Sequence, residues 1–116
     1  MKKLLFLILI GSGFTSLAQA VKDFALPDVS GKVIHLSDYS SSAGVVIIFT
    51  SNVCPFDEYY IERIKSLKPA NVSILLVNSG LEDGESVSAM TSRAKQKGIT
   101  LPYLADKDQL VLQDLN

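Results

Sequence analysis

The chain of 116 residues contains one cysteine, one histidine and no tryptophan. A single cysteine excludes an internal disulfide, so Cys54 is either a free thiol or half of a bond to another molecule. A structural zinc site needs about four ligands, which one cysteine and one histidine do not provide. We therefore expect neither a metal nor a bound cofactor, and Cys54 is the candidate for a reactive group.

Long hydrophobic runs are absent except near the N-terminus. Residues 1–20 begin with Lys2 and Lys3, continue with apolar residues at 4–10 and end in Ala-Gln-Ala. This order is typical of a cleaved signal peptide, and the apolar run is shorter than the roughly 20 residues that span a membrane. We predict a signal peptide at 1–20 and an exported protein, periplasmic or extracellular, without a stable membrane anchor. An uncleaved anchor is the alternative.

Charge of either sign is modest. Cleavage after Ala20 would remove two of the eleven basic residues and none of the twelve acidic ones, which leaves a net charge of −3. A mildly acidic chain is a poor ligand for nucleic acid, so we expect no nucleic-acid partner. The remaining residues, 21–116, are enough for one domain with a modest core.

Hydrophobic periodicity predicts strands that alternate with helices. The runs at 44–50 and 72–77 are rich in β-branched residues and predict buried strands, whereas 55–68 and 85–97 have apolar residues at helical spacing. Pro69 is expected to stop the first helix. This alternation indicates an α/β fold with a parallel sheet.

Shorter elements are predicted on both sides of this unit. Residues 24–28 and 33–36, joined by a turn at Gly31, predict an N-terminal hairpin. Ser37 is expected to cap a helical turn after the hairpin. Residues 101–104 predict a short strand, and Asp106 or Asp108 is expected to cap a last helix.

Cys54 lies where the first buried strand should give way to a helix. The sequence after the strand is Ser-Asn-Val-Cys-Pro at 51–55. Proline is favoured in the first turn of a helix because its missing N–H is not needed there. A thiol just before this proline lies at the positive end of the helix, which favours the nucleophilic thiolate. The position predicts a reactive cysteine; the alternative is an inert cysteine packed as a small hydrophobe.

Other polar and aromatic side chains near Cys54 have simpler interpretations. Asp57 suits the first turn of a helix, and a proton relay is the alternative. One of Tyr59 and Tyr60 is expected in the core and the other beside a substrate groove. His35 is expected to be a surface strand residue. An acidic group is predicted to be solvated; it comprises Glu82, Asp83 and Glu85.

Several motifs together resemble the thioredoxin-like superfamily. They are Phe-Ala-Leu-Pro-Asp at 24–28, Leu-Ser-Asp-Tyr at 36–39, the buried strand ending in Cys54-Pro55, and Leu-Pro-Tyr-Leu-Ala-Asp at 101–106. The resemblance is to the redoxin branch, which includes the alkyl hydroperoxide reductase/thiol-specific antioxidant proteins. It implies a three-layer sandwich with an N-terminal hairpin. It also implies closing strands and a helix that lie beyond Asn116, so we expect the chain to be a fragment.

The departures from that family narrow the expected chemistry. Asp57 occupies the fourth position of the Cys-x-x-Cys motif, so Cys54 matches the nucleophile and the resolving cysteine is missing. In the peroxidatic motif Ser51 can replace the threonine, but Ile47 stands at the proline position. Arg63 and Arg93 lie in predicted helices and do not match the family's strand arginine. A resolving thiol would come from sequence beyond Asn116, another protein or a small thiol.

We predict a thiol-based oxidoreductase in which the Cys54 thiolate attacks a disulfide or a peroxide. Its partners would be a thiol, disulfide or peroxide substrate and an external reductant. Three interpretations stay open. They are a disulfide reductase with its second cysteine beyond Asn116, a one-cysteine peroxidase, and a non-catalytic thioredoxin-like binding module with a residual cysteine.

Overall fold

The computed structural model describes residues 20–115, so the predicted signal peptide at 1–20 lies, apart from Ala20, outside the described residues. The strands are β1 (Ala25–Pro27), β2 (Val33–His35), β3 (Gly44–Phe49), β4 (Val72–Asn78) and β5 (Tyr103–Ala105). The helices are the 3-10 turn η1 (Leu36–Tyr39), α1 (Pro55–Ser66), α2 (Val87–Lys97) and α3 (Leu110–Asp114).

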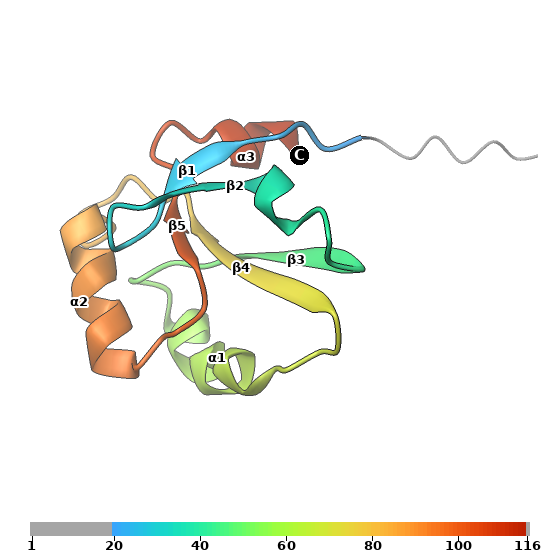
Figure 1. The fold of residues 1–116 in the computed structure, drawn as a ribbon. Coiled ribbons are helices and arrows are strands. Elements are labelled where there is room, and N and C mark those ends of the chain that lie inside the picture. The colour runs from blue at the N-terminus through green and yellow to red at the C-terminus, as the bar shows by residue number, and fades with distance from the viewer. Residues whose placement is uncertain (1–19, 116) are drawn as a thin grey trace, which may run out of the picture.

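The strands form an antiparallel hairpin, β1–β2, and a parallel sheet with the order β3-β4-β5. Helices α1 and α2 lie on one side of the parallel sheet, and the hairpin and α3 lie on the other (Figure 1). The predicted α/β class, the parallel sheet and the N-terminal hairpin are therefore confirmed, and the arrangement is a three-layer sandwich.

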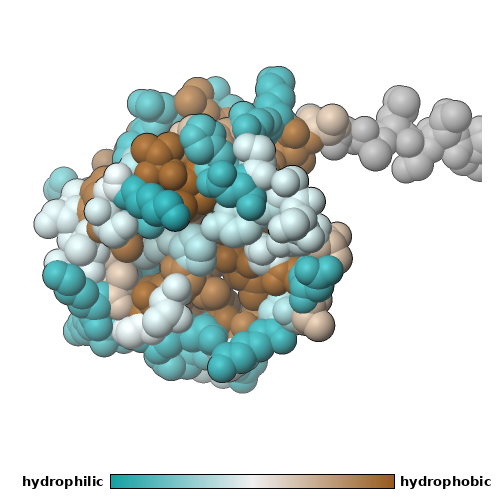
Figure 2. All heavy atoms as spheres, in the orientation of Figure 1, coloured by the Kyte–Doolittle hydropathy of each residue, from teal (hydrophilic) through white to brown (hydrophobic). Residues whose placement is uncertain are grey.

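Strand β4 is the centre of both hydrophobic cores because its side chains alternate between the two faces of the sheet. Leu75 and Val77 pack toward the hairpin and α3, with Leu26, Ile34, Leu104 and Val111. Leu76 packs toward α1 and α2, with Ile61, Met90, Ala94, Tyr103 and Ala105. Figure 2 shows hydrophobic side chains on the floor of a hollowed face, where β4 and α1 lie in Figure 1.

The ends of several elements differ from the predictions. Helix α1 ends at Ser66, before Pro69, and the backbone of the next residue, Leu67, is extended. Helix α2 begins at Val87 rather than at Glu85, because Ser86 caps it with a hydrogen bond from the Ala89 N–H. Gly98 ends α2 in the left-handed region at φ 61°, as predicted from its position.

Of the two predicted caps, the one at Ser37 is wrong and the one at Asp106 is present in a different position. Ser37 does not cap η1 but hydrogen-bonds to Asp23, whereas the Asp38 carboxylate accepts from the His35 N–H at 2.9 Å. Helix α3 begins after Gln109, but Asp106 still serves its first turn by accepting from the N–H groups of Leu110 and Leu112. The Asp106 carboxylate thus caps the first turn of α3, as expected, although Gln109 occupies the N-cap position.

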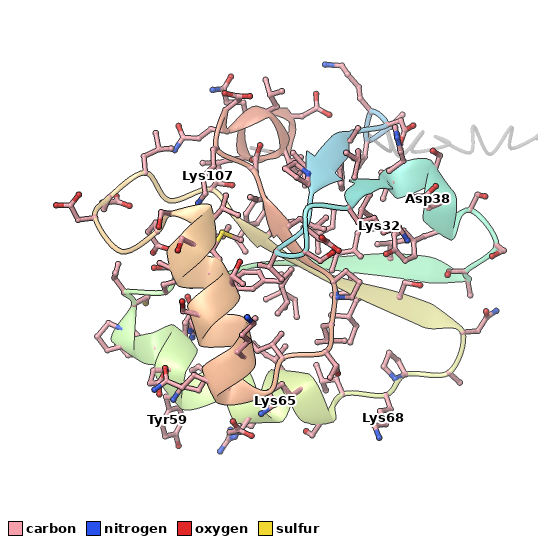
Figure 3. All side chains as sticks on the ribbon, turned by 60° about the vertical axis from the view of Figure 1, so that its left-hand side comes forward. Lys32, Asp38, Tyr59, Lys65, Lys68 and Lys107 are labelled. Carbon is pink, nitrogen blue, oxygen red and sulfur yellow. The ribbon has the colours of Figure 1, made fainter. Side chains whose placement is uncertain are left out.

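Neither tyrosine of α1 is in the core, contrary to the prediction for one of them. Tyr59 and Tyr60 are 65% and 46% exposed, and Figure 3 shows Tyr59 at the outer side of α1. The helix turns Ile61 inward instead, and Ile64 packs beside it. Among the described residues no helix has the length and apolar character to cross a membrane.

Candidate functional site

Cys54 is the N-cap residue of α1, and Pro55 is its first helical residue. The backbone of Cys54 is extended, with φ −79° and ψ 121°, and its carbonyl accepts the helical N–H of Glu58 at 3.3 Å. Its half-buried sulfur makes no capping hydrogen bond within the described residues. The predicted placement of the thiol at the positive end of a helix is confirmed, and the sulfur is left without a capping role.

A tight turn before α1 is organised by Ser51. Its hydroxyl oxygen accepts the backbone N–H groups of Val53 and Cys54, each at 3.2 Å. The Ser51 N–H donates in turn to Asp57 Oδ2 at 2.5 Å. Asp57 therefore joins the first turn of α1 to the preceding loop, which extends its predicted role at the helix start.

Glu85 fastens this turn to the loop that follows β4. Its carboxylate is buried, with 1% of the residue exposed, and it accepts from the Ser51 hydroxyl. It also accepts from the Asn52 N–H at 2.9 Å and from Asn78 Nδ2 at 2.6 Å. The prediction that Glu85 is solvated is wrong, because these three donors and the Val53 N–H, at 3.4 Å, replace the water around it.

The charge of Glu85 is stabilised in spite of its burial. Burial alone would raise its pKa, but hydrogen bonds from Asn78, Ser51 and the backbone of Asn52 and Val53 outweigh burial and lower the pKa overall. Glu85 is thus an anion at neutral pH, and it is hydrogen-bonded to the three residues that precede Cys54.

A second layer of polar contacts orients these groups. Asn78, at the end of β4, accepts from Lys107 Nζ at 2.7 Å through its Oδ1. The Tyr103 hydroxyl donates to Asn52 Oδ1 at 2.6 Å. Figure 3 shows Lys107 beside the N-terminal end of α2. Burial lowers the pKa of Lys107 and raises that of Tyr103. Asn52, Asn78 and Lys107 lie at or just beyond the carboxyl ends of β3, β4 and β5, where open α/β sheets bind ligands, and the Tyr103 hydroxyl reaches Asn52 from the start of β5.

Arg93 of α2 reaches the same end of the sheet, where it contacts Thr50, the residue after β3. The residue is 7% exposed, and its Nη1 donates to the Thr50 hydroxyl at 3.5 Å. Glu58 Oε2 lies 3.9 Å from Nη2, and Glu58 also pairs with Lys97. These contacts lower the pKa of Glu58, chiefly through the Lys97 hydrogen bond.

The predictions for the site were uneven. The structure brings Cys54, Ser51 and Asp57 together, but it leaves His35 exposed on β2, as expected of a surface residue. Glu85 and Arg93 were not predicted to lie at this site. A signal existed for Arg93, since it lies between Met90 and Ala94 on the inward stripe of a predicted helix.

The fold and this site define a thioredoxin-like α/β domain with a cysteine at the start of its first long helix. The profile of the AhpC/TSA family matches residues 17–116. The chain therefore belongs to the AhpC/TSA family. A comparison with curated proteins found no match.

Solved structures share this fold. A hypothetical protein from Sinorhizobium meliloti is 26% identical, with a TM-score of 0.74 over 80% of this chain and 55% of that one. An exposed lipoprotein thioredoxin from Streptococcus pneumoniae is 27% identical, with a TM-score of 0.64 over 79% of this chain and 71% of that one. The present chain thus spans little more than half the length of the Sinorhizobium protein.

A third structure supports the fold alone. It is a secreted disulfide oxidoreductase from Mycobacterium tuberculosis, 20% identical, with a TM-score of 0.66 over 80% of this chain and 67% of that one. Together the matches assign the chain to a family of thioredoxin-like and peroxiredoxin-like proteins.

Proposed function

We propose that this protein is a thiol-based oxidoreductase in which Cys54 is the nucleophile. The observation that carries the proposal is the position of the sulfur. It lies at the start of α1 without a capping hydrogen bond among the described residues, while Ser51 and Glu85 hold the turn before it. A helix start stabilises an anionic sulfur, and a fixed turn keeps the sulfur oriented toward a substrate.

Two substrates fit this chemistry. With a disulfide, the thiolate bonds to one sulfur, the sulfur–sulfur bond breaks and the other sulfur leaves as a thiolate. With a peroxide, the thiolate attacks one oxygen, the oxygen–oxygen bond breaks, and Cys54 becomes a sulfenic acid as hydroxide or alkoxide leaves. In both cases a second thiol must return Cys54 to the reduced state, because residues 1–116 contain no other cysteine. That thiol would come from sequence beyond Asn116, from another protein or from a small thiol.

Export belongs to the same proposal. It is supported by the signal-peptide pattern at 1–20 and by two relatives described as an exposed lipoprotein and as a secreted protein. An oxidising compartment would also supply disulfide substrates. Fractionation of cells, with sequencing of the mature N-terminus, tests this part; an N-terminus at Val21 in an extracytoplasmic fraction is the expected result.

The chemistry is tested by the reaction of Cys54 itself. We expect rapid alkylation at neutral pH, and a mass increase at Cys54 after treatment with a small excess of disulfide or peroxide. A mixed disulfide identifies the first substrate and trapping of a sulfenic acid identifies the second. The Cys54→Ser variant is the control. Slow alkylation at neutral pH and no reaction with either oxidant would favour the binding-module interpretation instead.

A further inference from the structure

A shallow polar pocket lies beside the loop that carries Cys54. It has a volume of about 340 Å³ and is lined by residues that include Asn52, Glu58, Gly84, Arg93 and Lys97. Asn52 precedes Cys54 by two residues, and Glu58 follows it by one helical turn. The pocket therefore lies against the loop and the first turn of α1 that flank the thiol.

Arg93 has an unused hydrogen-bond donor at this pocket. The side chain is 7% exposed, and its Nη2 has no hydrogen-bond partner within the described residues. Buried polar atoms in proteins almost always have a partner, and an unpaired donor on a charged group is especially costly. A ligand that accepts a hydrogen bond from Nη2 would remove this cost.

Glu58 stands where that ligand would bind. Its Oε2 is 3.9 Å from Arg93 Nη2, which is beyond hydrogen-bond distance, and its side chain is 53% exposed. Lys97, 27% exposed at its side chain, pairs with the same carboxylate. A half-exposed glutamate can turn into solvent at small cost, which would leave two cations facing an incoming anion.

We infer that Arg93 and Lys97 bind the carboxylate of a low-molecular-weight disulfide while Cys54 attacks its sulfur. This inference rests on the proposed function. A guanidinium recognises a carboxylate through two parallel hydrogen bonds, and the pocket has the size of a small-molecule site. When substrate is absent, the Glu58 carboxylate takes its place beside Arg93 and Lys97. The pocket therefore selects substrates by charge, next to a thiol that does not itself distinguish them.

Two disulfide reagents test this selection. Dithiobis(nitrobenzoate) carries a carboxylate on each ring, whereas dithiodipyridine carries none. With either one, the Cys54 thiolate bonds to one sulfur and releases the other as an aryl thiolate, which is followed by its absorbance. The measured quantity is the ratio of the two second-order rate constants in the full chain, so that a general change in Cys54 reactivity cancels.

We expect Arg93→Gln to lower the anionic-to-neutral ratio about tenfold, the effect of losing a charge-assisted hydrogen bond. Arg93→Lys should restore part of it, and Lys97→Gln should lower it about threefold, as for a more exposed ion pair. Lys95→Gln is the matched control, because it removes an exposed charge from the same helix and should leave the ratio unchanged.

Glu58→Gln provides an independent arm, since Glu58 is exposed enough for its replacement to preserve the fold. It should raise the ratio about threefold by removing the competing carboxylate. An unchanged ratio in folded Arg93→Gln, or in Glu58→Gln if the Arg93 variants do not fold, would overturn the inference while the proposed function stands. A wild-type Cys54 that fails to react even with dithiodipyridine would overturn both.

Discussion

The two long helices begin close together in the structure, but the start of each helix is fixed in a different way. Helix α2 begins with Ser86, whose hydroxyl accepts the Ala89 N–H at 3.1 Å. Helix α1 begins with Cys54, whose sulfur accepts no such bond among the described residues. The loop before α1 is fixed instead by Ser51 and by Glu85, which precedes α2.

This difference separates two tasks that an ordinary capping residue combines. At α2 one side chain both ends the loop and satisfies the helix start. At α1 the loop is held by neighbouring residues, so the residue at the cap position is free to react. Glu85 therefore connects the two helix starts: it lies just before one helix and determines the geometry of the other.

The largest expected effect on this comparison comes from Glu85→Ala. The change leaves Asn78 Nδ2, the Ser51 hydroxyl and the Asn52 N–H without their shared acceptor, and we expect unfolding to become easier by about 3 kcal/mol. Urea unfolding measures the change. Asp83→Ala, an exposed carboxylate in the same loop, is the control and should shift stability by less than about 0.5 kcal/mol. Equal effects of the two variants would show that the Glu85 contacts do not stabilise the loop.

The next effect depends on pH. The pKa of Glu85 is lowered on folding, so its ionised form contributes stability above its ordinary value of 4.5, and this contribution is lost as the pH falls through the lower folded value. Glu85→Gln should lower the free energy of unfolding by about 2 kcal/mol at neutral pH. The difference between the wild type and this variant should narrow below pH 4.5. A difference that stays constant down to pH 3 would mean that the charge of Glu85 is not involved.

The smallest effect is expected from Ser86→Ala, which acts on α2 alone. Loss of this N-cap should destabilise the protein by about 1 kcal/mol. The alkylation rate of Cys54 should not change, because the Ser86 hydroxyl accepts its hydrogen bond from the Ala89 N–H within α2 and not from the turn before α1. Thermal unfolding and alkylation of the same preparation test both parts. A slower alkylation would show that the two helix starts are coupled beyond Glu85.

Much of the fold follows from local pattern. The strands β3 and β4, the proline at the start of α1 and Gly98 at the end of α2 follow from short stretches of sequence, which predict them well. The prediction that β3 is buried is wrong, because β3 is an edge strand of the parallel sheet and leaves Val46 and Phe49 exposed. Exact helix ends were less predictable. Helix α2 starts after Ser86 rather than at Glu85, because the Ser86 hydroxyl caps the backbone and the Glu85 carboxylate turns inward.

The site was predictable only in part, because its polar contacts join distant segments. Cys54 and Asp57 stand out from the local strand-to-helix pattern. Glu85 looked like one of several loop acids, and only the pairing of β3 with β4 brings it beneath the Cys54 loop. Tyr59 and Tyr60 were misplaced for a related reason, since the rotation of α1 about its axis is set by Ile61 and its neighbours.

The contact between Ser51 and Glu85 also bears on the order of folding, because it spans 34 residues of the chain. The segment between them contains all of α1 and β4. Closing so long a loop costs entropy that local contacts do not repay, so the strand–helix–strand unit must form before this contact can stabilise anything. The turn that presents Cys54 is therefore a late element of folding, and a nascent chain acquires its oriented thiol only after the parallel pairing is complete.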